Sequence, residues 1–93
     1  MEVQEHSDHA MRIVKLTPEG SWSPCVTVLQ ERRGYGDHEW LEPTVNWSSF
    51  FDRKPGVTYA EAAASLSEAL ANAHNIASDW AEDCPKKAEA TAV

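Results

Sequence analysis

Three segments in the first half of the chain carry the residue pattern of β-strands. Residues 11–16 (MRIVKL) and 25–32 (CVTVLQER) are rich in β-branched and long apolar side chains. In residues 41–49 (LEPTVNWSS), apolar side chains occupy the odd positions up to Trp47, and polar side chains occupy the even ones. This period of two predicts a strand with one buried face and one solvated face. Pro43 cannot donate a ladder hydrogen bond, which places that end of the strand at a sheet edge or a bulge.

The second half of the chain has the period of an amphipathic helix. Thr58 followed by Glu61 fits a capping box, in which each side chain bonds a free backbone amide of the other residue. We therefore expect one helix that starts at Thr58 and runs to about Asp83, before the helix-stopping Pro85. Its apolar positions follow spacings of three and four and form one stripe. The stripe consists of Tyr59, Ala62, Leu66, Ala69, Ala73, Ile76 and Trp80, widened by Ala63, Leu70 and Ala77.

Together these elements predict an α+β fold, with a three-stranded antiparallel sheet followed by one long helix that packs on one face of the sheet. The glycines and the aspartate at residues 34–37 are typical of a hairpin connection. Residues 1–10 hold almost no apolar side chains, and residues 84–93 contain a helix-stopping proline and small residues. We interpret both segments as flexible tails. The single folded domain then spans residues 11–83.

The composition makes several classes of protein improbable. The 93 residues carry 8 Lys and Arg against 15 Asp and Glu, a net charge of −7, and this length fits one domain. No segment approaches the roughly 20 apolar residues of a membrane span, and the polar N-terminus differs from a secretory signal. Direct nucleic-acid binding needs clustered Lys and Arg, which this acidic chain has only in pairs. These features predict a cytoplasmic protein with no membrane and no direct nucleic-acid interaction.

The chain offers few of the residue clusters that catalysis or metal binding needs. Cys25 and Cys84 are interpreted as reduced thiols, with a single disulfide between them as the alternative. The two histidines of the N-terminal tail lack the paired Cys or His ligands of a zinc site. Cys25 with His38 or His74 has the residue types of a nucleophile and a base, but a thiol at the start of a strand is usually a small buried side chain. We therefore predict no cofactor, no metal site and no enzymatic activity.

The outward side of the predicted helix is strongly acidic. Residues 59–83 contain five acidic side chains and no Lys or Arg. Three of the five fall in the last turns, where the helix dipole disfavours negative charge and no basic residue one turn away offsets it. We interpret the acids as a stripe offered to a basic partner, with a merely solvated face as the alternative. The acids are Glu61, Glu68, Asp79, Glu82 and Asp83.

Four tryptophans are many for so short a chain. Trp47 and Trp80 fall at apolar positions of the predicted strand and helix, and we expect them in the core. Trp22 and Trp40 lie in loop regions, either folded back over the core or exposed as binding anchors. We predict a second contact surface at the hairpin tip, which consists of Tyr35, Asp37, Glu39 and Trp40.

One stretch of the predicted helix resembles a known family. The segment at residues 65–80 (SLSEALANAHNIASDW) resembles the helix of HicB-type antitoxins, in which a short antiparallel sheet precedes a run similar to its first nine residues. The matching residues are Ser65, Leu66, Glu68, Ala69, Leu70, Asn72 and Ala73. The chain lacks the family's Pro-Gly-Cys stretch before the helix and the DNA-binding segment that often follows it. In size, charge and lack of enzymatic motifs, the chain is also similar to small acidic phage proteins that block host defences, including anti-CRISPR proteins.

These observations predict a non-enzymatic protein-binding protein. We expect its acidic helix face and its hairpin tip to occupy a basic surface of a larger partner, including a surface that normally holds nucleic acid, as phage inhibitors do. The alternative is a dimeric toxin-neutralising or regulatory module, as the HicB resemblance implies. A three-stranded sheet leaves open edges, so a homodimer through strand edges or helix faces stays an open alternative.

Overall fold

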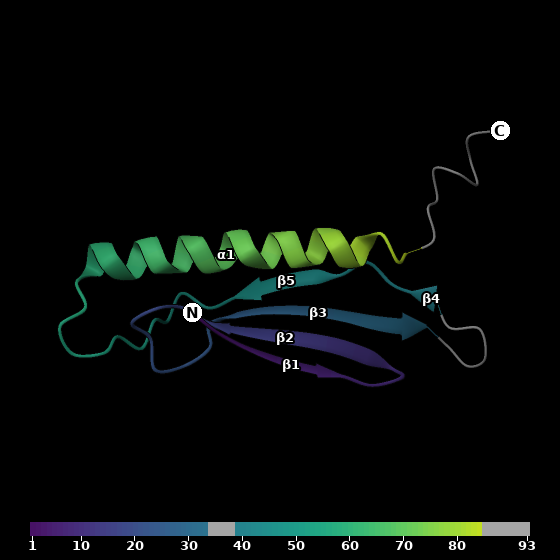
Figure 1. Ribbon diagram of the computed structural model, residues 1–93, viewed down its shortest axis with the longest axis horizontal. Helices are drawn as coiled ribbons and strands as arrows, with labels where there is room; N and C mark the ends of the chain where they lie inside the picture. The colour runs from purple at the N-terminus through teal and green to yellow at the C-terminus, as the bar shows by residue number, and fades with distance from the viewer. Residues whose placement is uncertain (34–38, 85–93) are drawn as a thin grey trace.

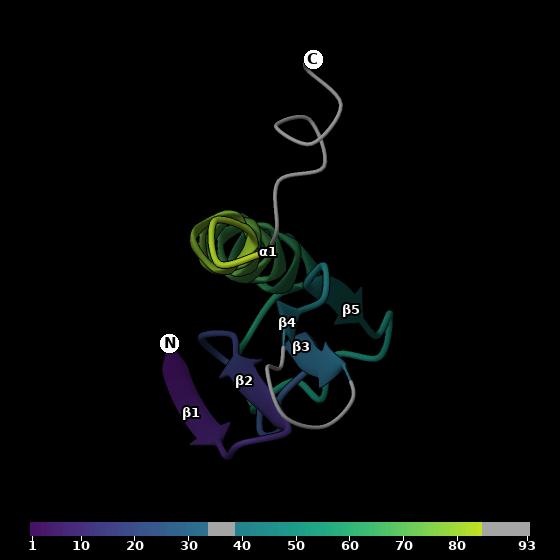
Figure 2. The same ribbon diagram turned by 90° about the vertical axis from the view of Figure 1, so that its right-hand side faces the viewer.

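The computed structural model describes residues 1–33 and 39–84 and has the predicted α+β fold (Figure 1). In these residues five strands precede one helix: β1 (Glu2–Ser7), β2 (Met11–Thr17), β3 (Val26–Arg33), β4 (Glu39–Trp40), β5 (Thr44–Trp47) and α1 (Tyr59–Ala81). The strands pair antiparallel in the order β1-β2-β3-β4, and β5 also pairs with β3. The helix α1 lies along one face of this sheet (Figure 2).

The N-terminal segment forms a hairpin with β2, so the prediction of a flexible tail over residues 1–10 is wrong. β1 pairs in register with the whole of β2. Asp8 shapes the turn, because its Oδ1 atom accepts hydrogen bonds from the backbone N–H groups of Ala10 and Met11 at 2.8 and 3.0 Å. These bonds lower the pKa of Asp8. All side chains of β1 are exposed, which means that backbone pairing rather than apolar burial holds the strand in place.

β2, β3 and β5 correspond to the three predicted strands, with boundaries shifted by at most three residues. Val14 lies opposite Val28, and Val28 lies opposite Val45, so alternate residues of the three strands share one face. This face packs against α1. Its buried apolar strand residues are Val14, Leu16, Val26 and Val28. The other face of the sheet carries half-buried side chains such as Ile13 and Leu29, so the core lies on one side of the sheet.

The short strand β4 was not predicted, because two residues are too few to show a period. In this strand Trp40 lies opposite Arg32 on β3. The predicted hairpin connection at residues 34–37 lies outside the described residues. The predicted C-terminal tail starts with Cys84, which is buried instead, and residues 85–93 lie outside the described part of the chain.

The helix α1 begins where the capping box predicts. Thr58 Oγ1 accepts a hydrogen bond from the Glu61 backbone N–H, and the Glu61 carboxylate accepts one from the Thr58 backbone N–H, both at 3.1 Å. The hydrogen bond that the carboxylate accepts from the Thr58 backbone N–H lowers the pKa of Glu61. Further along the helix, Ala62, Ala69 and Ala73 are buried. Their small side chains let the helix backbone come close to the strands.

Loss of the helix cap is expected to destabilise the domain moderately. Thr58→Ala should lower the free energy of unfolding by about 1 kcal/mol, because a backbone N–H at the helix start loses its acceptor. Urea unfolding followed by circular dichroism measures this change. Ser67→Ala, at an exposed position within the helix, is the control and should change the same quantity by less than about 0.5 kcal/mol. Equal effects of the two variants would contradict a stabilising role for the cap.

Candidate functional site

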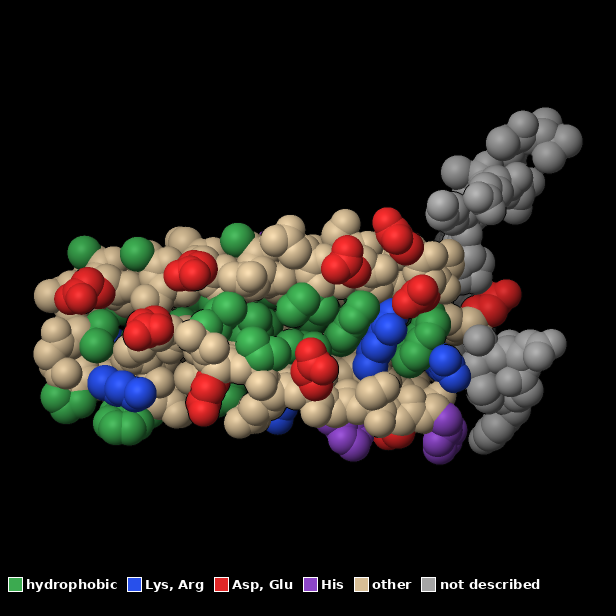
Figure 3. All heavy atoms as spheres, in the orientation of Figure 1, with side chains coloured by type: hydrophobic (Ala, Val, Ile, Leu, Met, Phe, Trp, Pro, Cys, Tyr) green, Lys and Arg blue, Asp and Glu red, His purple; other side chains and the backbone are tan. Residues whose placement is uncertain are grey.

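Four of the five predicted acids form a row along the exposed side of α1. We call this row the acidic stripe, and it consists of Glu61, Glu68, Asp79 and Glu82. Spacings of seven, eleven and three residues return to nearly the same side of a helix with 3.6 residues per turn, and the row spans roughly 30 Å at 1.5 Å per residue. Figure 3 shows acidic side chains along the length of the helix on one face of the molecule. The residues of α1 include no Lys or Arg.

Two of the predicted acids have partners within the domain. Glu61 closes the capping box. Asp83 accepts a hydrogen bond from Arg12 on β2, with 2.7 Å between Nη2 and Oδ2. An ion pair therefore ties the exposed Asp83 to β2, whereas the sequence predicted Asp83 as part of the free stripe. The salt bridges among the described residues involve none of Glu68, Asp79 and Glu82, so these three carry the free charge of the stripe.

Arg12 lies between two tryptophan rings at the end of the molecule where α1 finishes. Its guanidinium carbon is 4.5 Å from the centre of the Trp40 ring and 4.6 Å from the centre of the Trp80 ring. Cation–π contacts of this kind stabilise a partly desolvated guanidinium. Trp80 also packs against the core, as predicted. The same arginine therefore links β2, β4 and the last turns of the helix.

The predicted hairpin-tip surface is described only in part. Glu39 is exposed, whereas Trp40 is half-buried. A second cation, Arg32, stacks on Trp40 with its guanidinium carbon 4.2 Å from the ring centre. Trp40 therefore has a structural role that the sequence did not reveal. Tyr35 and Asp37 lie outside the described residues.

Gln30 is the buried centre of a polar network beneath these rings, and its side chain is 1% exposed. Its Nε2 atom donates hydrogen bonds to the carbonyl oxygens of Leu41 and Trp80 at 2.9 and 3.0 Å. Its Oε1 atom accepts a hydrogen bond from Arg12 Nε at 2.6 Å. The thiol of Cys84 donates to the same Leu41 carbonyl at 3.0 Å. The network fastens the end of α1 to β2, β3 and the segment between β4 and β5.

Four large aromatic side chains are exposed toward the opposite end of the molecule. They belong to the loop between β2 and β3, the last residue of β5, the loop that follows β5 and the first residue of α1, and Figure 1 shows these segments toward the end where α1 begins. We call this region the aromatic end. The exposed fraction of the residue is 62% for Trp22, 55% for Trp47, 70% for Phe50 and 80% for Tyr59. The prediction that Trp47 and Tyr59 belong to the core is wrong. Trp47 is the last residue of β5 and Tyr59 the first of α1, so each lies where its layer is no longer covered by the other.

Backbone contacts join the two loops of the aromatic end. The Trp22 N–H donates to the Asp52 carbonyl at 2.9 Å, and the Lys54 N–H donates to the Gly20 carbonyl at 2.8 Å. Gly20 has a φ of +82°, and a Cβ atom there would lie 2.9 Å from a methyl carbon of Val57. Lys54 Nζ lies 4.8 Å from the centre of the Trp22 ring. These contacts hold Trp22 away from the core, contrary to the folded-back alternative.

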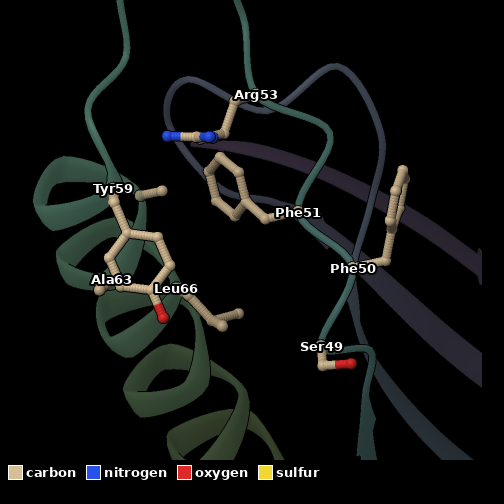
Figure 4. A pocket seen from close by; sticks show the side chains of 8 residues that line it. Ser49, Phe50, Phe51, Arg53, Tyr59, Ala63 and Leu66 are labelled. Atoms are coloured by element: carbon tan, nitrogen blue, oxygen red, sulfur yellow. The ribbon is translucent and has the colours of Figure 1, made fainter.

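A mostly apolar cleft of about 320 Å³ opens between the start of α1 and the loop after β5. Figure 4 shows Phe51 pointing toward the helix, on which Tyr59 and Leu66 lie, and Phe50 pointing away from it. Arg53 and Ser49 provide polar groups at the rim. The apolar periodicity does not reveal this cleft, because residues 50–57 lie between the predicted third strand and the predicted helix. The adjacent phenylalanines in that loop were the available signal.

The residues considered for catalysis or metal binding are not brought together. Cys25 and Cys84 are both buried free thiols, so the disulfide alternative is not realised, and burial raises the pKa of each thiol. His74 is exposed on the helix, while Cys25 lies in the core. In residues 1–33 and 39–84, no group of three His, Cys, Asp or Glu side chains is arranged to hold a metal ion. His38 lies outside the described residues.

Two further findings concern membrane-spanning helices and similarity to known proteins. In the described part of the chain, no helix is both long enough and apolar enough to span a membrane. Comparison with known proteins gives no match to any family model, curated protein or solved structure.

Proposed function

We propose that this chain is a non-enzymatic protein-binding protein that docks its acidic stripe on a basic surface of a larger protein. The observation that carries the proposal is the alignment of Glu68, Asp79 and Glu82 on one side of a single helix, without salt bridges in the described residues. Such a row presents negative charge at a regular spacing along a rigid element.

The position of these acids favours a binding role over a purely structural one. Asp79 and Glu82 lie in and just after the last turn of α1, where the negative end of the helix dipole repels carboxylates. A helix optimised only for stability would carry Lys or Arg there, and this helix has no basic residue in its last turn. An acidic row also accelerates association with a basic partner through long-range attraction.

The exposed side chains of the aromatic end are a second, independent observation that supports a protein-binding function. Large exposed aromatic side chains are enriched at the energetic centres of protein interfaces. Trp22, Phe50 and Tyr59 are each more than 60% exposed, and they lie beside the apolar cleft or on the loop joined to it. A protein partner that contacts this end would bury them.

A basic protein surface that fits an acidic helix is often one that binds the phosphates of nucleic acid. Occupation of such a surface makes this chain an inhibitor by steric exclusion, in the manner of the small acidic phage inhibitors to which its composition is similar. Because the attraction acts between exposed charges, binding should weaken steeply as salt screens them.

The stripe is tested by removing two of its charges. Glu68→Gln combined with Asp79→Asn should slow association with the partner roughly three- to tenfold at low salt, with no loss of stability in urea unfolding. The partner is first captured from a lysate of the source organism at low and high salt, identified by mass spectrometry and purified. Association rates of wild type and variant are then measured by surface plasmon resonance.

The control variant removes the same amount of charge elsewhere. Glu31→Gln combined with Glu42→Gln changes two exposed acids that lie off the helix, and it should leave the association rate within about twofold of wild type if the stripe itself is recognised. Equal slowing by both variants would show that only net charge matters. An unchanged rate in the stripe variant would contradict the proposal.

A further inference from the structure

β1 ends the sheet and has one unpaired edge. Among the described residues it pairs with β2 on one side, and no strand pairs with its other side. All six of its side chains are exposed. The helix contacts β2, β3 and β5 but does not cover β1, as Figure 2 shows. β1 carries no Lys, Pro or bulge to block pairing at its edge, and its charged side chains are the two carboxylates of Glu2 and Glu5.

The hydrogen bonds of the hairpin define which backbone groups lie on that edge. The Asp8 N–H donates to the Met11 carbonyl at 2.9 Å, and this pair continues the register of β1 with β2. Hydrogen-bonded and non-hydrogen-bonded pairs alternate along an antiparallel ladder. The N–H and C=O groups of Val3, Glu5 and Ser7 therefore point away from β2, to the free edge.

We propose that this edge pairs antiparallel with β1 of a second copy of the chain, about a two-fold axis that passes between the two Gln4 residues. Two-fold pairing of the free groups allows two central registers. A register centred on Glu5 places the two Glu5 carboxylates opposite each other, which is unfavourable. A register centred on Gln4 moves the two Glu5 carboxylates from directly opposite to diagonal positions, which weakens their repulsion. It also places Glu2 opposite the imidazole of His6 of the second copy.

The register centred on Gln4 also satisfies the free backbone groups and the exposed apolar side chain of β1. Val3 forms a hydrogen-bonded pair with Glu5 of the second copy, and Glu5 pairs with Val3 of that copy. The two Val3 side chains, each 47% exposed in the single chain, become diagonal neighbours on the face of the sheet that carries α1. Diagonal neighbours on one face lie within reach of each other.

In the dimer the acidic stripes of the two copies lie on the two sides of one trough. A two-fold axis between antiparallel edge strands is perpendicular to the sheet, so both α1 helices lie on the same face. Because α1 leaves β1 uncovered, the two β1 strands form the floor of a trough between the helices. Figure 3 shows acidic side chains along the face of α1 that is turned toward the viewer, and Figure 1 shows β1 from the same side. Such a trough fits an elongated basic segment of a protein. This last step rests on the proposed function, whereas the dimer does not.

The register is tested by cysteine cross-linking across the axis. With Gln4→Cys, the two introduced thiols lie on a non-hydrogen-bonded pair with about 4.5 Å between Cα atoms, a distance suited to a disulfide. Under mild oxidation this variant should form a covalent dimer at least tenfold faster than Ser67→Cys, an exposed helix position that reports random collisions. The native thiols are buried and should contribute little. Faster cross-linking of Glu5→Cys than of Gln4→Cys would overturn the proposed register.

The dimer itself is tested by analytical ultracentrifugation. The wild-type chain should sediment as a dimer at tens of micromolar, and Glu5→Pro should sediment as a monomer. Proline at this position removes an N–H that points to the free edge and spares the bonds to β2. Glu5→Ala is the matched control and should stay dimeric, and circular dichroism verifies that each variant is folded. A monomeric wild type would overturn the dimer, even if the stripe variant still loses its partner. If the wild type is a dimer but the stripe variant binds the partner as fast as wild type, the proposed function is contradicted and the dimer is not.

Discussion

Replacement of Gln30 by leucine is expected to lower the free energy of unfolding by about 3 kcal/mol. The leucine side chain is similar in size but has no polar atoms. It leaves the carbonyl oxygen of Trp80 without its side-chain donor and Arg12 Nε without its acceptor, both in a part-buried region around the fully buried position 30. Each buried polar group that loses its partner costs about 1–3 kcal/mol, and apolar contacts of the leucine offset part of this cost.

The loss should be concentrated at the end of the domain where α1 finishes. Urea unfolding gives the change in stability, and native-state hydrogen exchange gives its location. We expect the last two turns of the helix to exchange faster, while the turns near Thr58 stay protected until the whole domain unfolds. Asn46→Leu, which changes an exposed amide on β5, is the control and should alter stability by less than about 0.5 kcal/mol. Equal stability of Gln30→Leu and wild type would show that the hydrogen bonds of Gln30 do not stabilise the domain and that only the volume of its side chain matters.

The elements that the sequence predicts are those whose signals are local. The start of α1 is encoded by Thr58 and Glu61, which lie three residues apart and bond each other. The strands β2, β3 and β5 show apolar residues at alternate positions, because one face of each meets the helix. Both patterns arise from contacts made within one turn of a helix or one pleat of a strand.

β1 was missed because its stability does not come from its side chains. Every side chain of the strand is exposed, so no apolar pattern is required of it. The hairpin depends on backbone hydrogen bonds and on Asp8 at the turn. A single aspartate between polar residues is too common to identify a turn, and for this reason the segment resembled a tail.

In the candidate site too, the sequence predicts the features that depend on local patterns and misses those that depend on contacts between distant segments. The exposure of Glu68, Asp79 and Glu82 follows from the helical period and the position of the apolar stripe. The partner of Asp83 does not, because Arg12 is far away in the chain and meets Asp83 only when β2 lies beside the end of the helix. The aromatic end escaped prediction for a related reason. Trp47 and Tyr59 obey the apolar pattern, but the pattern does not show where the opposing layer ends.

The one-sided core leads to the second prediction of large effect. Leu16→Ala should lower the free energy of unfolding by about 3–4 kcal/mol, because Leu16 is fully buried between β2 and α1 and its removal leaves a cavity. A domain of this size has a total stability near the low end of about 5–15 kcal/mol, so the variant should be partly unfolded at 37 °C. Thermal and urea unfolding followed by tryptophan fluorescence measure both effects.

Ile13→Ala on the same strand provides the comparison. Ile13 is three residues away, points to the opposite face and is half-buried, so its truncation should cost only about 1 kcal/mol, in proportion to the smaller apolar area that is removed from water. A large difference between the two variants means that β2 has one core face and one solvent face, as a two-layer domain requires. Equal losses would mean that the second face is covered in solution. Since pairing through β1 extends the sheet in its own plane and leaves both faces as they are, the dimer would not explain such a result, and a partner layer on that face would have to be sought.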